Sequence, residues 1–191
     1  MAKEVVGKLL KFMESGSFDR GGVEIPSQCS IMFGGNLPIY KTPRFKLFPP
    51  EMQHKAFFDR IHGFIDGNAL PIIGKSDEHL SKSFGLTSDY FSEIMHLLRS
   101  ISYVGIVSEK VKIKNATLRD EKAVWKLTSG LLKLLYPDGN FGVEELLPLL
   151  SYAIHLRQQT IKAIAFMDAS EQQRILEYSL NAEGLATHDT A

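Results

Sequence analysis

Residues 29–38 read Cys29-Ser30-Ile31-Met32-Phe33-Gly34-Gly35-Asn36-Leu37-Pro38, an apolar run that stops abruptly at two glycines. Short apolar runs rich in strand formers and bounded by turn residues are typical of buried strands. We therefore expect a buried strand over 29–33 that delivers Asn36 at its carboxyl end, the edge where open α/β sheets bind ligands. On such a strand Cys29 is expected to be a small core residue rather than a nucleophile.

The residues before this run predict a helix and a hairpin. Apolar side chains recur at helical spacing over residues 2–14, with Glu4 and lysines on the other face, so we expect an amphipathic helix. Glycines and serines surround Phe18 and Arg20 in residues 15–22, which is typical of a loop or hairpin tip. Residues 23–25 can form a short strand that Pro26 stops.

The residues after the run alternate between loops and short elements. Prolines between 40 and 50 forbid a regular helix and predict an ordered loop. Residues 51–59 can form a short helix leading into Arg60. Residues 61–65 alternate like a strand, and 66–68 read as a turn.

From about residue 76 the pattern becomes mostly helical. Thr87 or Ser88 caps a helix to about residue 101, and Thr117 with Asp120 resembles a capping box that opens a helix to Tyr136. Residues 103–113 are ambiguous. Further helices are expected over 143–166 and 170–180, followed by a frayed tail.

Composition excludes several classes of protein. The chain has 191 residues, and 22 basic residues balance 22 acidic ones, which argues against a surface that generally coats nucleic acid or membrane. One cysteine excludes an internal disulfide and fits a reducing, cytoplasmic setting, although a secreted protein without disulfides would look the same. No apolar run is long enough for a transmembrane helix. Gly74-Lys75-Ser76 lacks the upstream glycine of a phosphate-binding loop, since that position is Ala69.

Three motifs follow one another in an order that resembles an AAA+ ATPase, in the variant of the replicative MCM helicases. The hairpin at 15–22 with the run at 29–38 resembles a pre-sensor hairpin and sensor 1 strand. Residues 56–62 (Ala-Phe-Phe-Asp-Arg-Ile-His) resemble an arginine-finger segment, and residues 115–120 (Asn-Ala-Thr-Leu-Arg-Asp) resemble a sensor 2 motif.

The amino-acid sequence of residues 13–21, 47–65 and 129–139 is similar to the Lon-related ATPase of the BREX phage-resistance systems. That family has been called an ATP-dependent Lon-like protease. The resemblance covers about residues 3–165. Its phosphate-binding loop and Mg²⁺-binding acidic motif would precede Met1, and its protease domain would follow the chain. The turn at 66–68 reads Asp-Gly-Asn where the family tends to have Pro-Gly-Trp.

The resemblance implies a fold of the α/β class that is rich in helix. A partial AAA+ core with few strands would span 1–75, an all-helical lid bundle 76–180, and a tail 181–191. ATP and Mg²⁺ would belong to the intact protein and would not bind this chain alone. The implied partners are other subunits of a homo-oligomeric ring, with DNA as a further candidate and no membrane; no metal ligands are expected in this chain.

The resemblance also assigns roles, each with a plainer alternative. Asn36 would be sensor 1 or would merely cap a turn, and Arg60 would be an arginine finger or a surface ion pair. Arg119 would be sensor 2 or a solvated helix residue. Arg20, with Phe18, would contact DNA or a protein substrate or would be an exposed loop residue.

The sequence therefore leaves three alternative functions open. The first is a fragment of a Lon-like AAA+ ATPase, inactive alone, that supplies sensor and finger residues to the nucleotide sites of a ring. The second is a DNA-translocating ring component without protease activity. The third is a stand-alone interaction module built on the helices of 87–180.

Overall fold

The computed structural model describes residues 3–36, 43–72, 74, 79–168 and 174–181. Over this part of the chain it is rich in helix, with two separate two-stranded antiparallel sheets, so the predicted α-rich α/β class is confirmed. The helices are α1 (Lys3–Ser15), α2 (Lys55–Phe58), α4 (Ser88–Leu97), α5 (Val104–Lys110), α6 (Leu118–Leu135) and α7 (Val143–Met167). The strands are β1 (Ser17–Arg20), β2 (Val23–Pro26), β3 (Val111–Lys114) and β4 (Glu177–Leu180).

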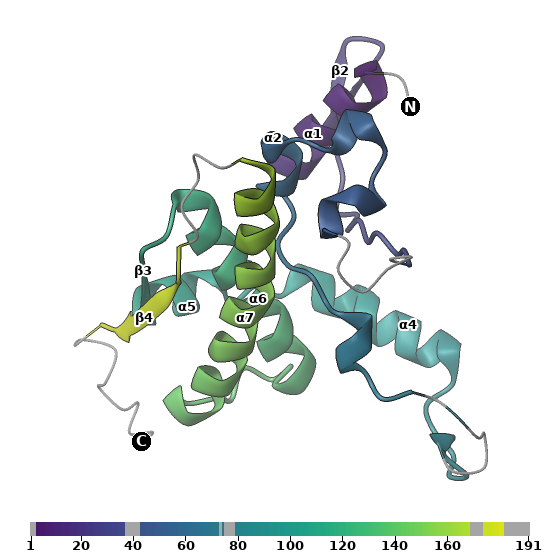
Figure 1. The fold of residues 1–191 in the computed structure, drawn as a ribbon. Coiled ribbons are helices and arrows are strands. Elements are labelled where there is room, and N and C mark those ends of the chain that lie inside the picture. Colours follow the sequence, from purple (N-terminus) through teal and green to yellow (C-terminus); the bar gives the residue numbers. More distant parts are fainter. Residues whose placement is uncertain (1–2, 37–42, 73, 75–78, 169–173, 182–191) are drawn as a thin grey trace.

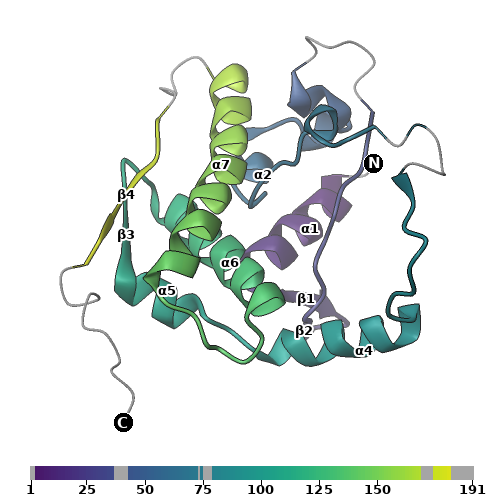
Figure 2. The same cartoon turned by 90° about the horizontal axis from the view of Figure 1, so that it is seen from below.

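The helices α6 and α7 pack against each other at the centre of the molecule (Figure 1). The β3–β4 pair lies on one side of α7 and α4 lies on the other, in both views (Figures 1 and 2). Short 3₁₀ turns at Arg44–Leu47, Pro50–Met52, Gly67–Ala69 and Leu98–Ser100 complete the described elements. No helix of the described residues is long and apolar enough to cross a membrane.

The predicted hairpin is confirmed. The helix α1 ends at Ser15, and Gly16 turns the chain with a φ of 70°. The strands β1 and β2 are joined by Gly21 and Gly22, whose φ values of 61° and 81° match a two-residue turn with both central residues left-handed. Glycine suits both positions because a side chain disfavours positive φ.

The strand predicted over 29–33 is wrong. The segment belongs to neither sheet, and Met32 is 94% exposed. Cys29 is exposed as well, so the core position expected for it is also wrong. An isolated extended segment has no neighbour for its ladder hydrogen bonds, and no strand pairs with it among the residues that the structure describes. Phe33 makes an edge-to-face contact with Phe48, at 5.3 Å between ring centroids.

The strand predicted over 61–65 is also wrong, because this segment packs on α7 instead of joining a sheet. The Phe64 amide donates a hydrogen bond to the carbonyl oxygen of Leu156 over 3.3 Å. Gly63 lies so close that a Cβ there would be 2.8 Å from the Leu156 Cβ. The absence of a side chain at Gly63 therefore allows the segment to reach the helix.

The predicted start of α6 is confirmed. The Thr117 side chain accepts a hydrogen bond from the Asp120 amide, and the Asp120 carboxylate accepts one from the Thr117 amide. This reciprocal capping box satisfies two amides that the first turn leaves free. Thr87 caps α4 in a similar way, accepting from the amide of Tyr90.

The helix predicted over 170–180 is wrong at its end, where residues 177–180 form β4 and pair antiparallel with β3. The Gln158 side chain of α7 holds the residues that precede β4 in place. It accepts a hydrogen bond from the Leu176 amide and donates one to the Arg174 carbonyl oxygen. Residues 169–173 and the predicted tail from 182 lie outside the described residues.

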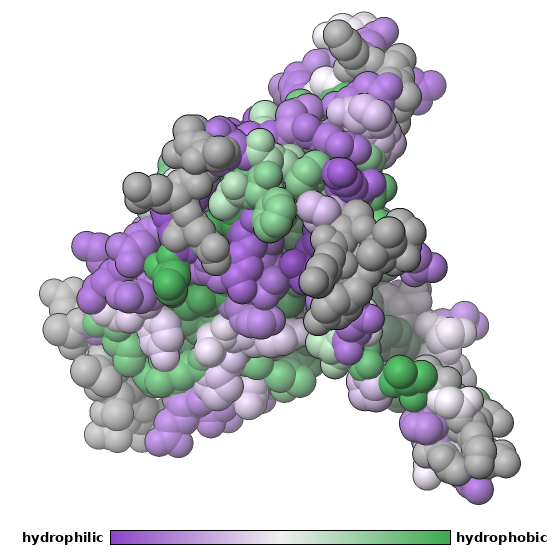
Figure 3. Space-filling model, in the orientation of Figure 1, coloured by the Kyte–Doolittle hydropathy of each residue, from purple (hydrophilic) through white to green (hydrophobic). Residues whose placement is uncertain are grey.

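Two hydrophobic clusters stabilise the fold. One surrounds the contact of α6 with α7, and the other gathers phenylalanines of α2 and its neighbours beneath α1. Helix α7 contributes Leu146 and Leu150 to the first cluster, and Ala163 and Ile164 to the second. The segment that leads into α4 stays outside both clusters and exposes apolar side chains, with Phe84 fully exposed at 107%. Figure 3 shows hydrophobic residues lying among hydrophilic ones on the face of the molecule that it draws.

Candidate functional site

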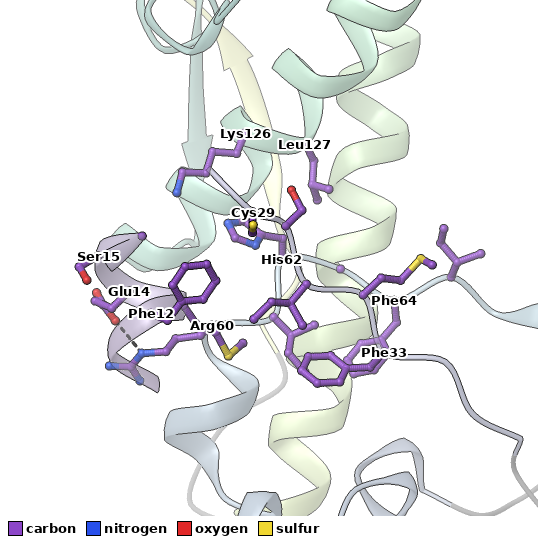
Figure 4. Close-up of a pocket in the computed structure, with 18 of the residues that line it drawn as sticks. Phe12, Glu14, Ser15, Cys29, Phe33, Arg60, His62, Phe64, Lys126 and Leu127 are labelled. Atoms are coloured by element: carbon purple, nitrogen blue, oxygen red, sulfur yellow. Dashed lines mark ion pairs between the residues drawn. The ribbon is translucent and has the colours of Figure 1, made fainter. Parts of the chain in front are cut away.

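Arg60 follows α2 directly and is mostly buried, with 17% of its side chain exposed. Its Nη1 donates to the carbonyl oxygen of Ala56 over 2.6 Å. Its Nε forms an ion pair with Glu14 Oε2, at 2.8 Å (Figure 4). The head group of Arg60 is therefore held against the end of α1.

Arg119 lies in the first turn of α6, and its side chain is 44% exposed. One terminal nitrogen is 3.2 Å from Glu14 Oε2, the same oxygen that Arg60 approaches. The other is 3.5 Å from Asp59 Oδ2. The two predicted arginines, which lie far apart in the sequence, thus converge on a single carboxylate oxygen.

Both arginines pair with an anionic group of the chain itself, the carboxylate of Glu14. Guanidinium groups match the geometry of carboxylate and phosphate oxygens alike. Glu14 lies in the last turn of α1, where the partial negative charge of the helix end repels an acidic side chain. The two arginines offset that repulsion.

A cavity of about 680 Å³ adjoins Arg60 (Figure 4). It lies between the end of α1, the extended segment 29–33, the segment 60–65 and α6, where Lys126 and Leu127 line it. Its one histidine is His62. Burial, aided by the positive charges of Lys126 and Arg157, lowers the pKa of His62 to about 4. His62 is therefore neutral near pH 7 and adds no positive charge to the cavity.

Asn36 is exposed at the end of the segment that follows the hairpin. Within the described residues no hydrogen bond or ion pair joins it to Arg60 or Arg119. The structure therefore brings two of the three predicted catalytic residues together, and the role of Asn36 stays a prediction. Leu37, Pro38, Lys75 and Ser76 lie outside the described residues.

The hairpin presents Phe18 and Arg20 on one face, since alternate residues of a strand share a side. The opposite face is fixed to α1, because Lys11 Nζ lies 2.6 Å from Asp19 Oδ2 and 3.7 Å from Glu24 Oε1. Phe18 is 37% exposed and Arg20 is exposed. These two predicted contact residues therefore point away from α1.

Sequence reasoning missed Glu14 and Arg157. Glu14 is an acid at the carboxyl end of a helix, where acids are disfavoured, and that misplacement is a signal. Arg157 falls on the buried stripe of α7, between Ala153 and Ile161, where a charged residue is out of pattern. Neither signal names a partner, because the partners lie far away in the sequence.

No group of three or more histidine, cysteine or acidic side chains suited to a metal ion occurs among the described residues.

Comparison with known proteins identifies the family of this chain. Residues 1–177 match a family model of an ATPase domain. That model is described as Lon-like protease BrxL-like, ATPase domain, and the chain belongs to this family.

Two relatives carry the name Lon-like protease BrxL. The one from Escherichia coli O9:H4 (strain HS) is 35% identical over 164 residues, which are 82% of this chain and 23% of that protein. The one from Bacillus cereus (strain H3081.97) is 33% identical over 160 residues, 80% of this chain and again 23% of the relative. The chain thus spans about a quarter of the length of these relatives.

Proposed function

We propose that this chain is part of a Lon-like AAA+ ATPase of a phage-defence system, in which it supplies Arg60 and Arg119, with Asn36, to the nucleotide sites of a ring. The observation that carries the proposal is the convergence of both arginines on Glu14 Oε2. A pair of guanidinium groups that share one oxygen atom is suited to a terminal phosphate.

Arginines in such sites act by charge. A finger that stabilises the charge of the transition state contributes on the order of 10³–10⁵ in rate. Because Arg60 and Arg119 converge, both would serve the same phosphate. Asn36 would orient the attacking water by hydrogen bonds rather than by acid–base chemistry.

ATP would be the substrate of this site, and Mg²⁺ would neutralise phosphate charge when bound. The two converging arginines support a phosphate at this position. Residues elsewhere in the intact protein would hold Mg²⁺, as the family resemblance implies. This chain alone is expected to hydrolyse no ATP.

The first test is the gene itself. A coding region upstream of Met1 with a G-x-x-x-x-G-K-[ST] strand–loop–helix would support the ATPase role. A start codon at Met1 with no such region upstream would contradict it and favour an interaction module built on residues 87–180.

The second test mixes subunits of the protein encoded by the whole gene. Subunits with Arg60→Ala and subunits with a substituted phosphate-loop lysine should each be inactive. Mixed together, they should regain part of the ATPase activity if Arg60 acts on a neighbouring subunit. Absence of recovery, with both variants in assembled rings, would overturn this role of Arg60.

DNA is a second candidate ligand, and the exposed face of the hairpin favours it. Arg20 and Phe18 lie on that face, while Lys11 fixes the other face to α1. A cation beside an aromatic ring on a projecting hairpin suits a nucleic-acid backbone and an unstacked base. This function would make the ring a translocase, with or without protease activity elsewhere in the protein.

A further inference from the structure

Arg157 of α7 connects the two segments that carry the arginine pair. Its Nε donates to Asp120 Oδ1 over 2.8 Å, and its Nη1 donates to the carbonyl oxygen of Ile61 over 2.5 Å. Asp120 follows Arg119 directly, and Ile61 follows Arg60 directly. The Arg157 side chain is buried, with 1% exposed, and it forms hydrogen bonds with the residue that follows each arginine of the pair.

Further contacts make both attachments rigid. On the Ile61 side, Gly63 and Phe64 pack directly against Leu156, the residue before Arg157. On the other side, Asp120 Oδ2 accepts from the amide and hydroxyl of Thr117 and from Arg174. Neither attachment point can shift without breaking several hydrogen bonds or the close contact at Gly63.

We propose that Arg157 is a positioning residue that fixes the separation of Arg60 from Arg119, so that both guanidinium groups reach one anion. This inference rests on the proposed function, because it concerns the same phosphate site. Arginine suits the task since its planar fork donates in two directions at once. Lysine keeps the charge but is a point donor, and it cannot hold Asp120 and the Ile61 carbonyl with the same geometry.

A purely structural role for Arg157 makes a different prediction. A buried ion pair that only supports the fold would change stability and leave anion binding by the folded protein untouched. The experiment must therefore measure anion binding at Arg60 and Arg119 directly, in protein that is shown to be folded.

The experiment titrates the 191-residue chain with pyrophosphate and follows the Nε–H signals of Arg60 and Arg119 by NMR. In the wild-type chain both signals should shift with one common midpoint. In Arg157→Lys we expect the midpoint to rise about tenfold or more and the two signals to separate. Circular dichroism and Trp125 fluorescence would show that the variant is folded.

Gly63→Ala provides a second variant that changes no charge. Its Cβ would lie 2.8 Å from the Leu156 Cβ, so the segment that carries Arg60 must move. We expect the same loss of a common midpoint. Gly130→Ala is the matched control, because a Cβ at Gly130 of α6 meets nothing within 4 Å, and it should titrate like the wild-type chain.

The outcomes separate the two proposals. If pyrophosphate fails to shift both signals in the wild-type chain, or if Arg60→Ala and Arg119→Ala leave its binding unchanged, the phosphate site itself is wrong. If both arginines bind it but Arg157→Lys and Gly63→Ala keep the common midpoint, the positioning role is wrong. If Arg157→Lys does not fold, Gly63→Ala against Gly130→Ala decides.

Discussion

The guanidinium of Arg157 and the carboxylate of Asp120 form an ion pair that is almost completely removed from solvent, with 1% and 0% of the two side chains exposed and 2.8 Å between Nε and Oδ1. Burial raises the pKa of Asp120. Hydrogen bonds from Thr117 and the charge of Arg157 outweigh it and hold the pKa below its ordinary value. Asp120 therefore stays charged at neutral pH.

Removing one partner of this pair should destabilise the protein strongly. Arg157→Met leaves the Asp120 charge buried without this partner, and we expect the free energy of unfolding to fall by about 3–5 kcal/mol. Urea unfolding followed by the fluorescence of Trp125 measures this change. Arg99→Met, at an exposed arginine, is the control and should change stability by less than about 0.5 kcal/mol. A loss below about 1 kcal/mol in Arg157→Met would contradict the importance of the pair.

The stability of the chain should depend on pH through His62. Its pKa is lowered to about 4 in the folded chain and is near 6.5 when unfolded, so between these values the unfolded state binds more protons. The free energy of unfolding should therefore fall as the pH is lowered from 6.5 to about 4, by up to about 3 kcal/mol.

Urea unfolding across this pH range tests the contribution of His62. His62→Gln should flatten the dependence, whereas His96→Gln, at an exposed histidine of α4, should retain it. Equal slopes in all three proteins would show that His62 is not the group responsible.

The hairpin turn should tolerate asparagine better than valine at Gly22, where φ is 81°. A β-branched residue in the left-handed region costs about 1–2 kcal/mol, while asparagine visits it readily. We expect Gly22→Val to speed amide exchange across β1 and β2 by about tenfold relative to Gly22→Asn. Comparable exchange in the two variants would mean that the turn does not limit the stability of the hairpin.

If the hairpin contacts DNA, Arg20→Ala should weaken binding and reduce its salt dependence. Loss of one phosphate contact lowers the slope of log K against log salt by about 0.9. Fluorescence anisotropy with a labelled duplex at several salt concentrations gives this slope. Arg99→Ala serves as the comparison. An unchanged slope in Arg20→Ala would remove Arg20 from the DNA-contact role.

Helix starts and turns that depend on neighbouring residues alone could be predicted from the sequence. The capping box joins Thr117 to Asp120, only three residues further on, and the glycine pair of the hairpin specifies its own turn. Residues 177–180 could not be predicted, because their strand conformation depends on pairing with β3, which lies more than sixty residues earlier. The segment 29–33 misled for the same reason, since a strand requires a neighbour.

In the candidate site, too, the features with local sequence signals could be predicted and the contacts between distant segments could not. Arg60 and Arg119 were predicted from the motifs around them, and each could be assigned a role without knowledge of the other. Their common partner Glu14 comes from α1, and no spacing in the sequence indicates that it meets both. Contacts between distant segments are set by tertiary packing, which local patterns do not encode.

The position of α7 has a consequence for how the protein melts. A single helix of 25 residues contributes Leu150 to one hydrophobic cluster and Ile164 to the other. Helix formation is cooperative, so disorder in either cluster withdraws support from the helix that the other cluster needs. The two clusters are therefore thermodynamically linked, and heating should produce one shared transition rather than two.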